Sequence, residues 1–540
     1  MITYRDIFKW GDKREETIEP GMKSLLTEKF GFDENDFKIT NPEGKIPVNI
    51  EKSCIIPEDI IFELEKICGN ENVSKNDIDR ANHSYGKYYN ELLKLRLGII
   101  ENPPDLIVFP RNHDEVAQII AICNQHKIPV VPFGGGSSVT GALQMPGGGI
   151  CVDLSRNMNK IIEINEINHS VRVEAGIFGP KLEKELNNYK SGYTCGHFPQ
   201  SFEFSTPGGW IAARGAGTFS TGYGKIEDMV LSLNVICPSG AVETKDYPAD
   251  AEGIDLKRIF MGSEGIFGII TEVTLKIRKF RPENTKYASF IFKSFESAID
   301  AMRISMQEGY GKPHLYRISD PTETDIAFKL KEFENTLSDK VLKLMGYKPG
   351  QRVLMFAAIE GDQMYPPFVK KRLKVTAAKY GGFYIGSKPT KKWLEQRYSS
   401  AYARDPIMDK GLITDTIETS VNWQNLIPLW KSIINYLNSN EKTICMTHIS
   451  HVYENGANLY ITYLKPIDKN DPLPDFEKLH NGLVETIIQN KGSLSHHHGI
   501  GRVLAPWMKK QFKSNEIALL RAIKSELDPQ NIMNPGCILV

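Results

Sequence analysis

Three adjacent histidines, His496, His497 and His498, lie between small residues in the stretch GSLSHHHGIG at positions 492–501. Imidazole titrates near neutral pH and can both donate and accept a proton, so the tract could move protons during a reaction. Adjacent side chains point in different directions on a strand or a helix, so one metal ion could not take all three and would need other ligands. A solvated polar loop is the third interpretation.

A glycine-rich loop follows a predicted strand at positions 129–141, in the stretch PVVPFGGGSSVTG. Such a loop lets the backbone approach a ligand closely and point several N–H groups at one anion, as phosphate sites do. Two familiar motifs do not fit, because a dinucleotide-binding GxGxxG would need glycine at Val139 and a P-loop would need lysine at Ala142. By itself the loop could equally be a tight structural turn.

Two more glycine clusters follow in the same half of the chain. The first includes Thr206, Gly208 and Gly209 and continues over positions 213–217, and the second is MGSEGIFG at 261–268. Glycine leaves room for a ligand to lie against the backbone. Three such clusters in one region predict a long cofactor that extends through it.

The elements that must position these residues follow from the apolar periodicity. Apolar residues recur at helical spacing after Asn112, which predicts an amphipathic helix capped by Asn112 with Glu115, and IPVVP predicts a buried strand. Short strands continue to about residue 280, where FRPEN interrupts the pattern, and strands then alternate with long helices. A last helix is predicted from Lys509 to Leu527. We expect an α+β chain divided at 1–99, 100–281, 282–502 and 503–540.

Composition excludes several classes of protein. Lys plus Arg equals Asp plus Glu, at 66 each, so no net field attracts nucleic acid or an anionic membrane. The eight cysteines are scattered without a CxxC pair, which indicates reduced thiols. The sequence shows no apolar signal region, no stretch near the roughly 18 apolar residues of a membrane span, and no peroxisomal Ser-Lys-Leu ending. We expect a cytoplasmic protein that binds no nucleic acid.

The order of these motifs resembles a known flavoprotein family. PFGGGSSVTG, GHFPQSFEFSTPGGWIAARGAG and GSEGIFGIITEVTLKI resemble the FAD-binding domain of the vanillyl-alcohol oxidase type. PHLYRISD, YARDPIMDKGLITDTIETSVNW, ISHVYENGANLYITY and GSLSHHHGIG resemble, more specifically, the alkyldihydroxyacetonephosphate synthases. The resemblance implies a helical lead-in, a two-lobed FAD-binding domain, an α+β cap domain with an antiparallel sheet, and a C-terminal helix and tail that pack back on the FAD-binding domain.

The same resemblance assigns residues to the cofactor. The backbone of the glycine loop would hold the pyrophosphate, other residues would lie along FAD, and Glu264, Gly265 and Ile270 would lie near its adenine end. FAD should be bound non-covalently, because the loop lacks the histidine that carries flavin in covalent members. The implied contacts are Pro132, Gly134, Gly135, Gly136, Ser137, Ser138, Ser201, Thr206, Gly208, Gly209, Arg214, Glu264, Gly265 and Ile270.

Tyr460 stands where related D-2-hydroxyacid dehydrogenases have a metal-binding imidazole, although His451 of the same segment is retained. We therefore expect no metal. A buried tyrosine whose anion is stabilised by nearby histidines could remove a proton from carbon, whereas a strand tyrosine could also be packing only. The resemblance makes Tyr460 the catalytic base. His197, His496, His497 and His498 would tune it and assist the leaving and entering groups.

Arg317 is the candidate phosphate ligand of the second domain. A guanidinium suits a small phosphate through paired hydrogen bonds, and a salt bridge to Asp320 is the alternative. Arg404, in YARD, is more typical of a structural arginine.

The resemblance implies an exchange reaction with no net oxidation. Acyl-dihydroxyacetone phosphate would lose its fatty acid and gain a long-chain alcohol while the flavin holds the carbon framework. A D-2-hydroxyacid dehydrogenase on the same fold and a flavin-binding protein without catalysis are the two alternatives. We expect a homodimer, and peripheral contact with a membrane stays open.

Overall fold

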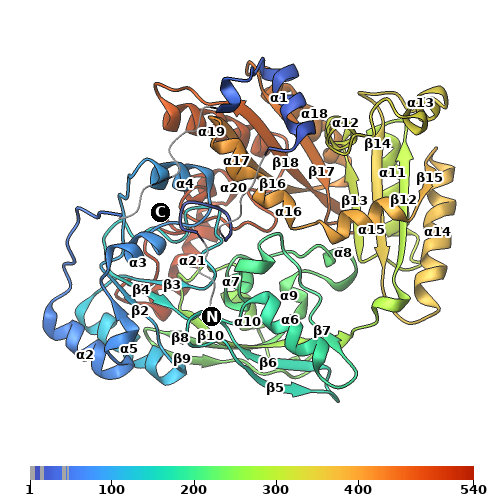
Figure 1. Cartoon of the computed structure of the whole chain (residues 1–540). Helices are drawn as coiled ribbons and strands as arrows, with labels where there is room; N and C mark the ends of the chain where they lie inside the picture. Colours follow the sequence, from blue (N-terminus) through green and yellow to red (C-terminus); the bar gives the residue numbers. More distant parts are fainter. Residues whose placement is uncertain (1–5, 13–17, 39–43, 45–47) are drawn as a thin grey trace.

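The computed structural model describes residues 6–12, 18–38, 44 and 48–540 and has an α+β fold (Figure 1). Parts of the predicted helical lead-in, at 1–5, 13–17, 39–43 and 45–47, lie outside the described residues. Three larger sheets, of four, five and seven strands, organise the chain. The glycine clusters belong to the first two sheets and the histidine tract lies beside the third, so the fold brings together groups that are far apart in sequence.

The four-stranded sheet presents the glycine loop at residues 134–138. Three of its strands are parallel, and the loop begins where β3 ends, at the carboxyl edge where sheets of this kind bind ligands. In spatial order the strands are β1 (Val73–Ser74), β2 (Leu106–Val108), β4 (Ile150–Asp153) and β3 (Val130–Phe133).

Helix α5 (His113–His126) connects β2 to β3 and confirms the predicted amphipathic helix. The Asn112 side chain accepts the N–H of Glu115 at 2.9 Å, so the cap is the predicted one. The predicted apolar face is buried, with Val116 and Ile119 fully inaccessible. Burial of this face fixes the helix against the sheet and thereby the start of the glycine loop.

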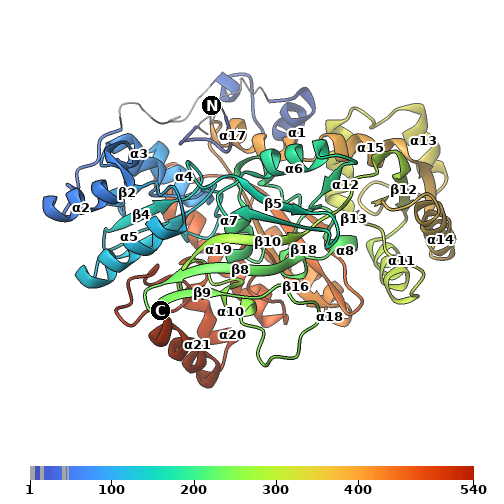
Figure 2. The same ribbon diagram turned by 90° about the horizontal axis from the view of Figure 1, so that it is seen from below.

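A five-stranded antiparallel sheet forms the second half of the first lobe (Figure 2). The third glycine cluster leads into its central strand β10, and the second cluster forms α7, which packs against β10. Its strands are β5 (Ile161–Asn165), β6 (Ser170–Glu174), β10 (Ile269–Lys276), β8 (Val230–Cys237) and β9 (Gly240–Glu243). The accompanying elements are α6 (Gly179–Asn188), α7 (Pro207–Ala212), α8 (Ser220–Tyr223), α9 (Ile226–Met229), α10 (Lys257–Phe260) and the strand pair β7 (Tyr193–Thr194) and β11 (Arg278–Lys279).

The second lobe is built on a seven-stranded sheet in which every pairing is antiparallel. Long helices pack on one face of this sheet (Figure 1). In spatial order the strands are β15 (Phe383–Gly386), β12 (Lys286–Phe292), β14 (Val353–Ile359), β13 (Leu315–Ser319), β17 (Ile444–Ile449), β18 (Gly456–Pro466) and β16 (Leu412–Asn422). The helices are α11 (Phe295–Gln307), α12 (Pro321–Leu330), α13 (Leu337–Leu344), α14 (Tyr365–Lys379), α15 (Lys388–Glu395), α16 (Ser399–Tyr402), α17 (Arg404–Met408), α18 (Trp423–Asn438) and α19 (Pro472–Gln489).

The other face of the seven-stranded sheet borders a cavity. Side chains alternate along a strand, so residues two apart share this face. Arg317 of β13, His448 of β17 and Tyr460 of β18 all line the cavity, whereas Tyr463, on the opposite face of β18, is fully buried. The alternation therefore places the polar groups on the cavity side and apolar groups under the helices.

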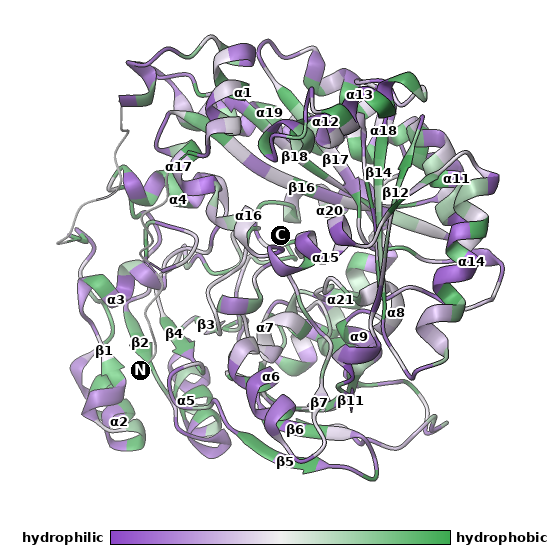
Figure 3. Cartoon of the chain, turned by 45° about the vertical axis from the view of Figure 1, so that its right-hand side comes forward, coloured by the Kyte–Doolittle hydropathy of each residue, from purple (hydrophilic) through white to green (hydrophobic). Residues whose placement is uncertain are grey.

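The described part of the first hundred residues has a small apolar cluster of its own, and its other elements pack on the two lobes. Helix α2 (Glu58–Cys68) packs on α5, and β1 extends the four-stranded sheet (Figure 3). Helix α1 (Pro20–Phe30) instead packs on α12 of the second lobe. The remaining helices are α3 (Asp77–Asn82) and α4 (Tyr89–Arg96). The lead-in thus spans both lobes and reaches the cavity, which its Trp10 and Leu25 help to line.

The predicted C-terminal helix from Lys509 to Leu527 is wrong in one respect, because the structure divides it into α20 (Met508–Gln511) and α21 (Ser514–Leu527). The N–H of Lys513 donates to Glu516 at 2.7 Å, so a new helix start is formed where apolar periodicity predicted continuation. After α21 the tail runs beside β3, where the N–H of Val130 donates to Ile532 O at 2.8 Å.

All eight cysteines are free thiols, as predicted, and seven of them are buried. Among the described residues, the helices are too short or too polar to cross a bilayer.

Candidate active site

A cavity of about 1750 Å³ lies between the glycine clusters and the seven-stranded sheet. This volume exceeds the roughly 300–1,000 Å³ of an ordinary ligand pocket, so it has room for more than one ligand. Most of the predicted site residues line it. These are Pro132, Gly134, Gly135, Gly136, Ser137, Ser138, Ser201, Thr206, Gly208, Gly209, Glu264, Gly265, Ile270, Arg317, Tyr460, His497 and His498.

The glycine loop leaves no space for side chains on its inner side. A Cβ atom on Gly134 would lie 2.3 Å from the Thr206 hydroxyl, and one on Gly135 would lie 1.9 Å from the carbonyl oxygen of Phe204. The Thr206 hydroxyl is buried and has no hydrogen-bond partner among the described residues. A backbone cradle with an unpartnered hydroxyl beside it fits the phosphates of FAD, which would supply the missing partner.

Replacing Gly135 with alanine should abolish FAD binding, because the added methyl group would collide with the Phe204 backbone rather than with a movable side chain. We expect the purified Gly135→Ala protein to lose the flavin absorbance near 450 nm, with FAD affinity reduced at least about 100-fold. Gly147→Ala is the matched control, because a Cβ there meets nothing within 4 Å. Unchanged flavin content in Gly135→Ala would show that this loop does not hold the cofactor.

Glu264 lines the cavity, but its carboxylate serves the loop that follows the histidines. The two oxygens accept the N–H groups of Ile500 and Gly501 at 2.5 and 2.6 Å. Burial raises the pKa of Glu264 to about 7, while the two N–H groups act against this increase. A Cβ on Gly499 would lie 1.9 Å from the same carboxylate, so glycine is required there. Glu264 therefore ties the third glycine cluster to the histidine loop.

The histidine tract is a loop organised by Glu418 of β16. The N–H groups of His496, His497 and His498 donate to its two carboxylate oxygens at 2.7, 3.1 and 3.0 Å. Neither the strand nor the helix geometry considered from the sequence applies, because the backbone curls around a buried anion. The charge of His497 and its hydrogen bond hold the pKa of Glu418 well below its usual range, although burial alone would raise it.

Glu418 was missed by sequence reasoning. It is the only charged residue of the stretch TIETSVNW and lies opposite Tyr460 in the β16–β18 register. An acidic residue in an otherwise uncharged stretch of strand, with Asp415 three positions earlier, could have indicated it.

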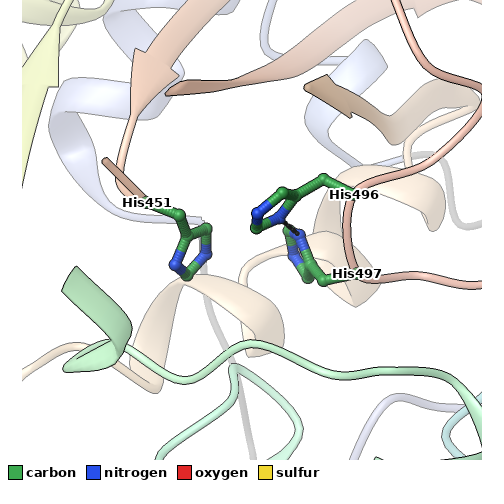
Figure 4. Close-up of side chains that lie close together, drawn as sticks. All are labelled: His451, His496 and His497. Carbon is green, nitrogen blue, oxygen red and sulfur yellow. Dashed lines mark hydrogen bonds between the residues drawn. The ribbon is translucent and has the colours of Figure 1, made fainter. Parts of the chain in front are cut away.

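The imidazoles of His451, His496 and His497 face one another (Figure 4), with one nitrogen of each within 4.8 Å of the others. This trio differs from the consecutive one considered from the sequence, because His451 replaces His498. His451 Nδ1 lies 2.6 Å from the Ser220 hydroxyl, and the Nδ1 atoms of His496 and His497 are 3.0 Å apart. The spacing would also suit a cation, but the nitrogens of His496 and His497 are hydrogen-bonded to each other, which is typical of imidazoles that share protons.

Tyr460 lies among imidazole rings at the centre of the site. Its ring stacks on His448 with centroids 4.7 Å apart and an interplanar angle of 15°, and the centroid of His498 is 5.5 Å away, edge-on. Burial raises the pKa of Tyr460 to about 12, and the carboxylates of Glu418 and Asp415 contribute in the same direction. The predicted stabilised anion is therefore wrong, because desolvation outweighs the hydrogen bond with Thr416 and the charge of Arg317, which lower the pKa.

Four imidazoles of the site, those of His448, His498, His451 and His496, are neutral at neutral pH. Burial lowers the pKa of His448 and that of His498 to about 4, and the charges of Arg317 and His497, respectively, lower them further. Burial also holds the pKa values of His451 and His496 well below the usual range. A neutral imidazole can accept a proton, so these four side chains can act as general bases at neutral pH.

Arg317 lines the cavity and is partly neutralised. Its guanidinium pairs with Glu323 at 2.6 Å and not with Asp320, so the predicted alternative partner is wrong. Asp320 instead caps the start of α12, where its side chain accepts the N–H of Glu323 at 2.8 Å. Arg404 also lines the cavity, and its Nε and one terminal nitrogen are buried without a hydrogen-bond partner among the described residues.

Three predicted site residues do not line the cavity. The Arg214 side chain is half exposed and pairs with Glu227 at 2.7 Å. His197 is fully buried against Trp210, with ring centroids 4.7 Å apart, and burial lowers its pKa to about 3. His496 lies behind His497 and shares a hydrogen bond of 2.6 Å with the Tyr453 hydroxyl. These residues can act on a ligand only through their neighbours.

Comparisons with known proteins agree with this geometry. Residues 104–245 match the model of an FAD binding domain, and residues 281–538 match that of the C-terminal domain of FAD linked oxidases. The chain is 32% identical to alkyldihydroxyacetonephosphate synthase of Dictyostelium discoideum over 88% of this chain and 80% of that protein. It is 27% identical to a mitochondrial D-lactate dehydrogenase (cytochrome) of Arabidopsis thaliana over 90% and 80% of the two chains. A solved structure of alkyldihydroxyacetonephosphate synthase superposes with a TM-score of 0.85 at 28% identity, covering 98% of both chains.

Proposed function

Because this chain belongs to the family of alkyldihydroxyacetonephosphate synthases and contains an FAD-binding domain, we propose that it exchanges the fatty acid of acyl-dihydroxyacetone phosphate for a long-chain alcohol. The single observation that carries the proposal is the cavity itself, which the glycine clusters border on one side and Tyr460 with its imidazoles on the other. The reaction exchanges one oxygen substituent for another on the same carbon and involves no net oxidation.

We assign a separate role in this exchange to FAD, to Tyr460 with its imidazoles, and to Arg317. When bound, FAD supplies a ring that can hold the carbon framework between departure of the acid and entry of the alcohol. The Tyr460 phenolate oxygen takes a proton from the carbon next to the ketone, and a neighbouring neutral imidazole must first accept the phenol proton because the pKa of Tyr460 is raised to about 12. Arg317 is the proposed phosphate ligand. Its Nε–H group has no partner among the described residues and is free to donate to the phosphate, because Glu323 pairs with another nitrogen of the guanidinium.

The cavity has an apolar part that could hold the alkyl chain. It lies between α1, α12 and α13, away from the glycine loop, and consists largely of aliphatic and aromatic side chains. Apolar walls favour a hydrocarbon chain over a small hydroxy acid. The apolar residues of this part include Ile18, Met22, Leu25, Ile326, Phe328, Leu330, Phe333, Leu342, Leu354 and Phe356.

The D-2-hydroxyacid dehydrogenase alternative makes the opposite redox prediction. Such an enzyme would bleach its flavin with a hydroxy acid in the absence of oxygen and would need an electron acceptor. The apolar part of the cavity and Tyr460 both favour the exchange reaction. The third function, flavin binding without catalysis, predicts no product under any condition.

One experiment separates these functions. The purified yellow protein is incubated without oxygen or acceptor with acyl-dihydroxyacetone phosphate and a radiolabelled hexadecanol. We expect a labelled ether product, release of the fatty acid in equal amount, and no lasting bleaching of the flavin. Flavin bleached by D-lactate, with no ether formed, would overturn the proposal in favour of a dehydrogenase.

We further propose that the protein contacts a membrane through α13, because lipid substrates reside there. Helix α13 carries apolar colour at the periphery of the molecule (Figure 3), and Leu337 and Leu344 are 82% and 88% exposed. Leu337 also lines the cavity, so the exposed surface and the apolar part of the cavity are continuous. Exposed apolar residues next to lysines, here Lys340 and Lys343, are typical of helices that lie in a membrane interface.

The double substitution Leu337→Asp with Leu344→Asp should reduce binding to phosphatidylcholine vesicles at least about 100-fold, since each leucine contributes roughly 1.5–3 kcal/mol when removed from water. Vesicle co-sedimentation measures the effect. Ile167→Asp is the matched control, because Ile167 is 94% exposed on a strand turn outside the cavity lining. Equal binding of all three proteins would exclude α13 as the contact.

The predicted homodimer remains a prediction. Analytical ultracentrifugation, which measures the mass of the protein in solution, would test it.

A further inference from the structure

Lys225, in the short link between α8 and α9, is a buried lysine beneath the histidine loop. Its ammonium donates to the backbone carbonyl of His496 at 2.6 Å. Its nearest carboxylate is that of Glu227 at 3.7 Å, which Arg214 already holds at 2.7 Å. A buried ammonium whose closest partner is a neutral carbonyl, and whose ion pair with Glu227 is shared with Arg214, places a positive charge beside the imidazoles.

Glu418 places the opposite charge on the other side of the same loop. Besides its three backbone hydrogen bonds, its carboxylate lies 3.3 Å from Nδ1 of His497. Of His451, His496 and His497, His497 is thus the one that pairs with a carboxylate, whereas His496 has the ammonium at its own carbonyl. His498 lies farther from the same carboxylate, at 3.9 Å, and His448 pairs with Glu323. The loop therefore lies between a buried cation and a buried anion.

We infer that Lys225 is a positioning residue which, together with Glu418, directs the first proton taken up by the cluster onto His497 and keeps His451 and His496 neutral. A positive charge close to an imidazole disfavours its protonated form, and an adjacent carboxylate favours it. The directions of the pKa shifts agree: after burial, the charges of His497 and Lys225 lower the pKa of both His451 and His496.

The consequence for catalysis rests on the proposed function, although the proton placement does not. With the first proton on His497, the nitrogens of His451 and His496 remain acceptors, in addition to those of His448 and His498, for a proton released by Tyr460. The titratable and charged groups that face this cluster from all packed elements are Lys225, Glu227, Glu418, His197, His448, His451, His496, His497, His498, Tyr453, Tyr460 and Arg317.

The test compares the holoenzyme with Lys225→Met and with the charge-conserving Lys225→Arg. ¹⁵N-labelled histidine reports the protonation of each ring by NMR, with signals assigned from single His→Asn variants. In the unaltered protein we expect His497 to take up a proton before His451 and His496 as the pH is lowered. In Lys225→Met the midpoints of His451 and His496 should rise by about one to two pH units, since a unit charge is removed a few ångströms away. Lys225→Arg should restore the original midpoints.

Activity provides the second measurement. The acidic limb of the pH–rate profile for ether formation should move upward by the same interval in Lys225→Met and return in Lys225→Arg. If His451 or His496 protonates before His497 in the unaltered protein, the inference is overturned even when no variant folds. Midpoints unchanged in a folded, FAD-containing Lys225→Met protein would also overturn it. Absence of ether product from every protein would count against the proposed function alone, because the NMR result does not depend on turnover.

Discussion

Tyr460→Phe should lower the rate of ether formation by about 100-fold to 10,000-fold while FAD content stays unchanged. The substitution removes the phenol oxygen that lines the cavity at the stacked imidazoles, and general-base catalysis typically contributes this range. The ring itself remains, so its packing on His448 is preserved. The effect should therefore fall on kcat and leave the flavin spectrum intact.

A partial reaction makes this prediction specific. Substrate deuterated at the carbon next to the ketone should lose deuterium to water with the unaltered protein and retain it with Tyr460→Phe. Tyr436→Phe is the matched control, because its hydroxyl donates to Leu479 O at 3.1 Å between two helices of the outer layer. Deuterium loss at the normal rate in Tyr460→Phe would assign the base to another group.

The raised pKa of Tyr460 adds a pH dependence. The phenol is neutral at neutral pH, because its pKa is about 12 in the absence of ligands, so proton removal must be coupled to acceptance by an imidazole. The acceptors His448 and His498 have pKa values near 4 and are available throughout the neutral range. Activity should therefore fall on the acid side as these imidazoles and those of His451 and His496 become protonated.

Glu418→Ala should destabilise the protein by about 3–5 kcal/mol, because it removes a buried anion from three backbone N–H groups and from His497. Glu418→Gln should preserve the shape but lose the charge, and we expect FAD retention with ether formation reduced at least about 100-fold. Denaturant unfolding and the exchange assay measure the two effects. Glu485→Gln, which alters an exposed ion pair between Glu485 of α19 and Lys510 of α20, should change neither.

The stabilising effect of Glu418 should depend on pH with a defined sign. Its pKa in the folded protein lies well below the usual value of 4.5, so the unfolded chain binds the proton more readily. Its contribution is complete above pH 4.5 and is lost as the pH falls towards the folded-state value. The difference in free energy of unfolding between the unaltered protein and Glu418→Gln should be constant from pH 6 to 8 and smaller at pH 4. A difference that grows on acidification would contradict the depressed pKa.

Local elements could be predicted from the sequence because their causes are local. The cap of α5 and its apolar face lie within fourteen consecutive residues, and a run of glycines directly after a strand indicated the glycine loop. The lack of space at Gly135, in contrast, comes from the backbone of Phe204 and could not be predicted locally. The division of the last helix was missed, because Lys513 is an unusual residue at a helix start and apolar periodicity continues across it. Here a weak local preference was overridden by a side-chain hydrogen bond.

The arrangement of the site could not be predicted in the same way, because it depends on contacts across long stretches of chain. Glu418 reaches the histidine tract about 80 positions later through the pairing of β16 with β18, and Ser220 and Lys225 reach it from the other lobe. No periodicity encodes such distances. The placement of Arg214 and His197 away from the cavity has the same origin.

The sequence by itself determined the cofactor class, through the order of three glycine clusters, and the candidate residues Tyr460, Arg317 and the histidine tract. Only the tertiary structure decided their chemical states. A pKa depends on how completely water is removed from a group and on which charges surround it, and both are properties of the packed lobes. Tyr460 therefore holds its proton and the imidazoles of His448 and His498 beside it are neutral, although residue types alone suggested a tyrosine anion stabilised by nearby histidines.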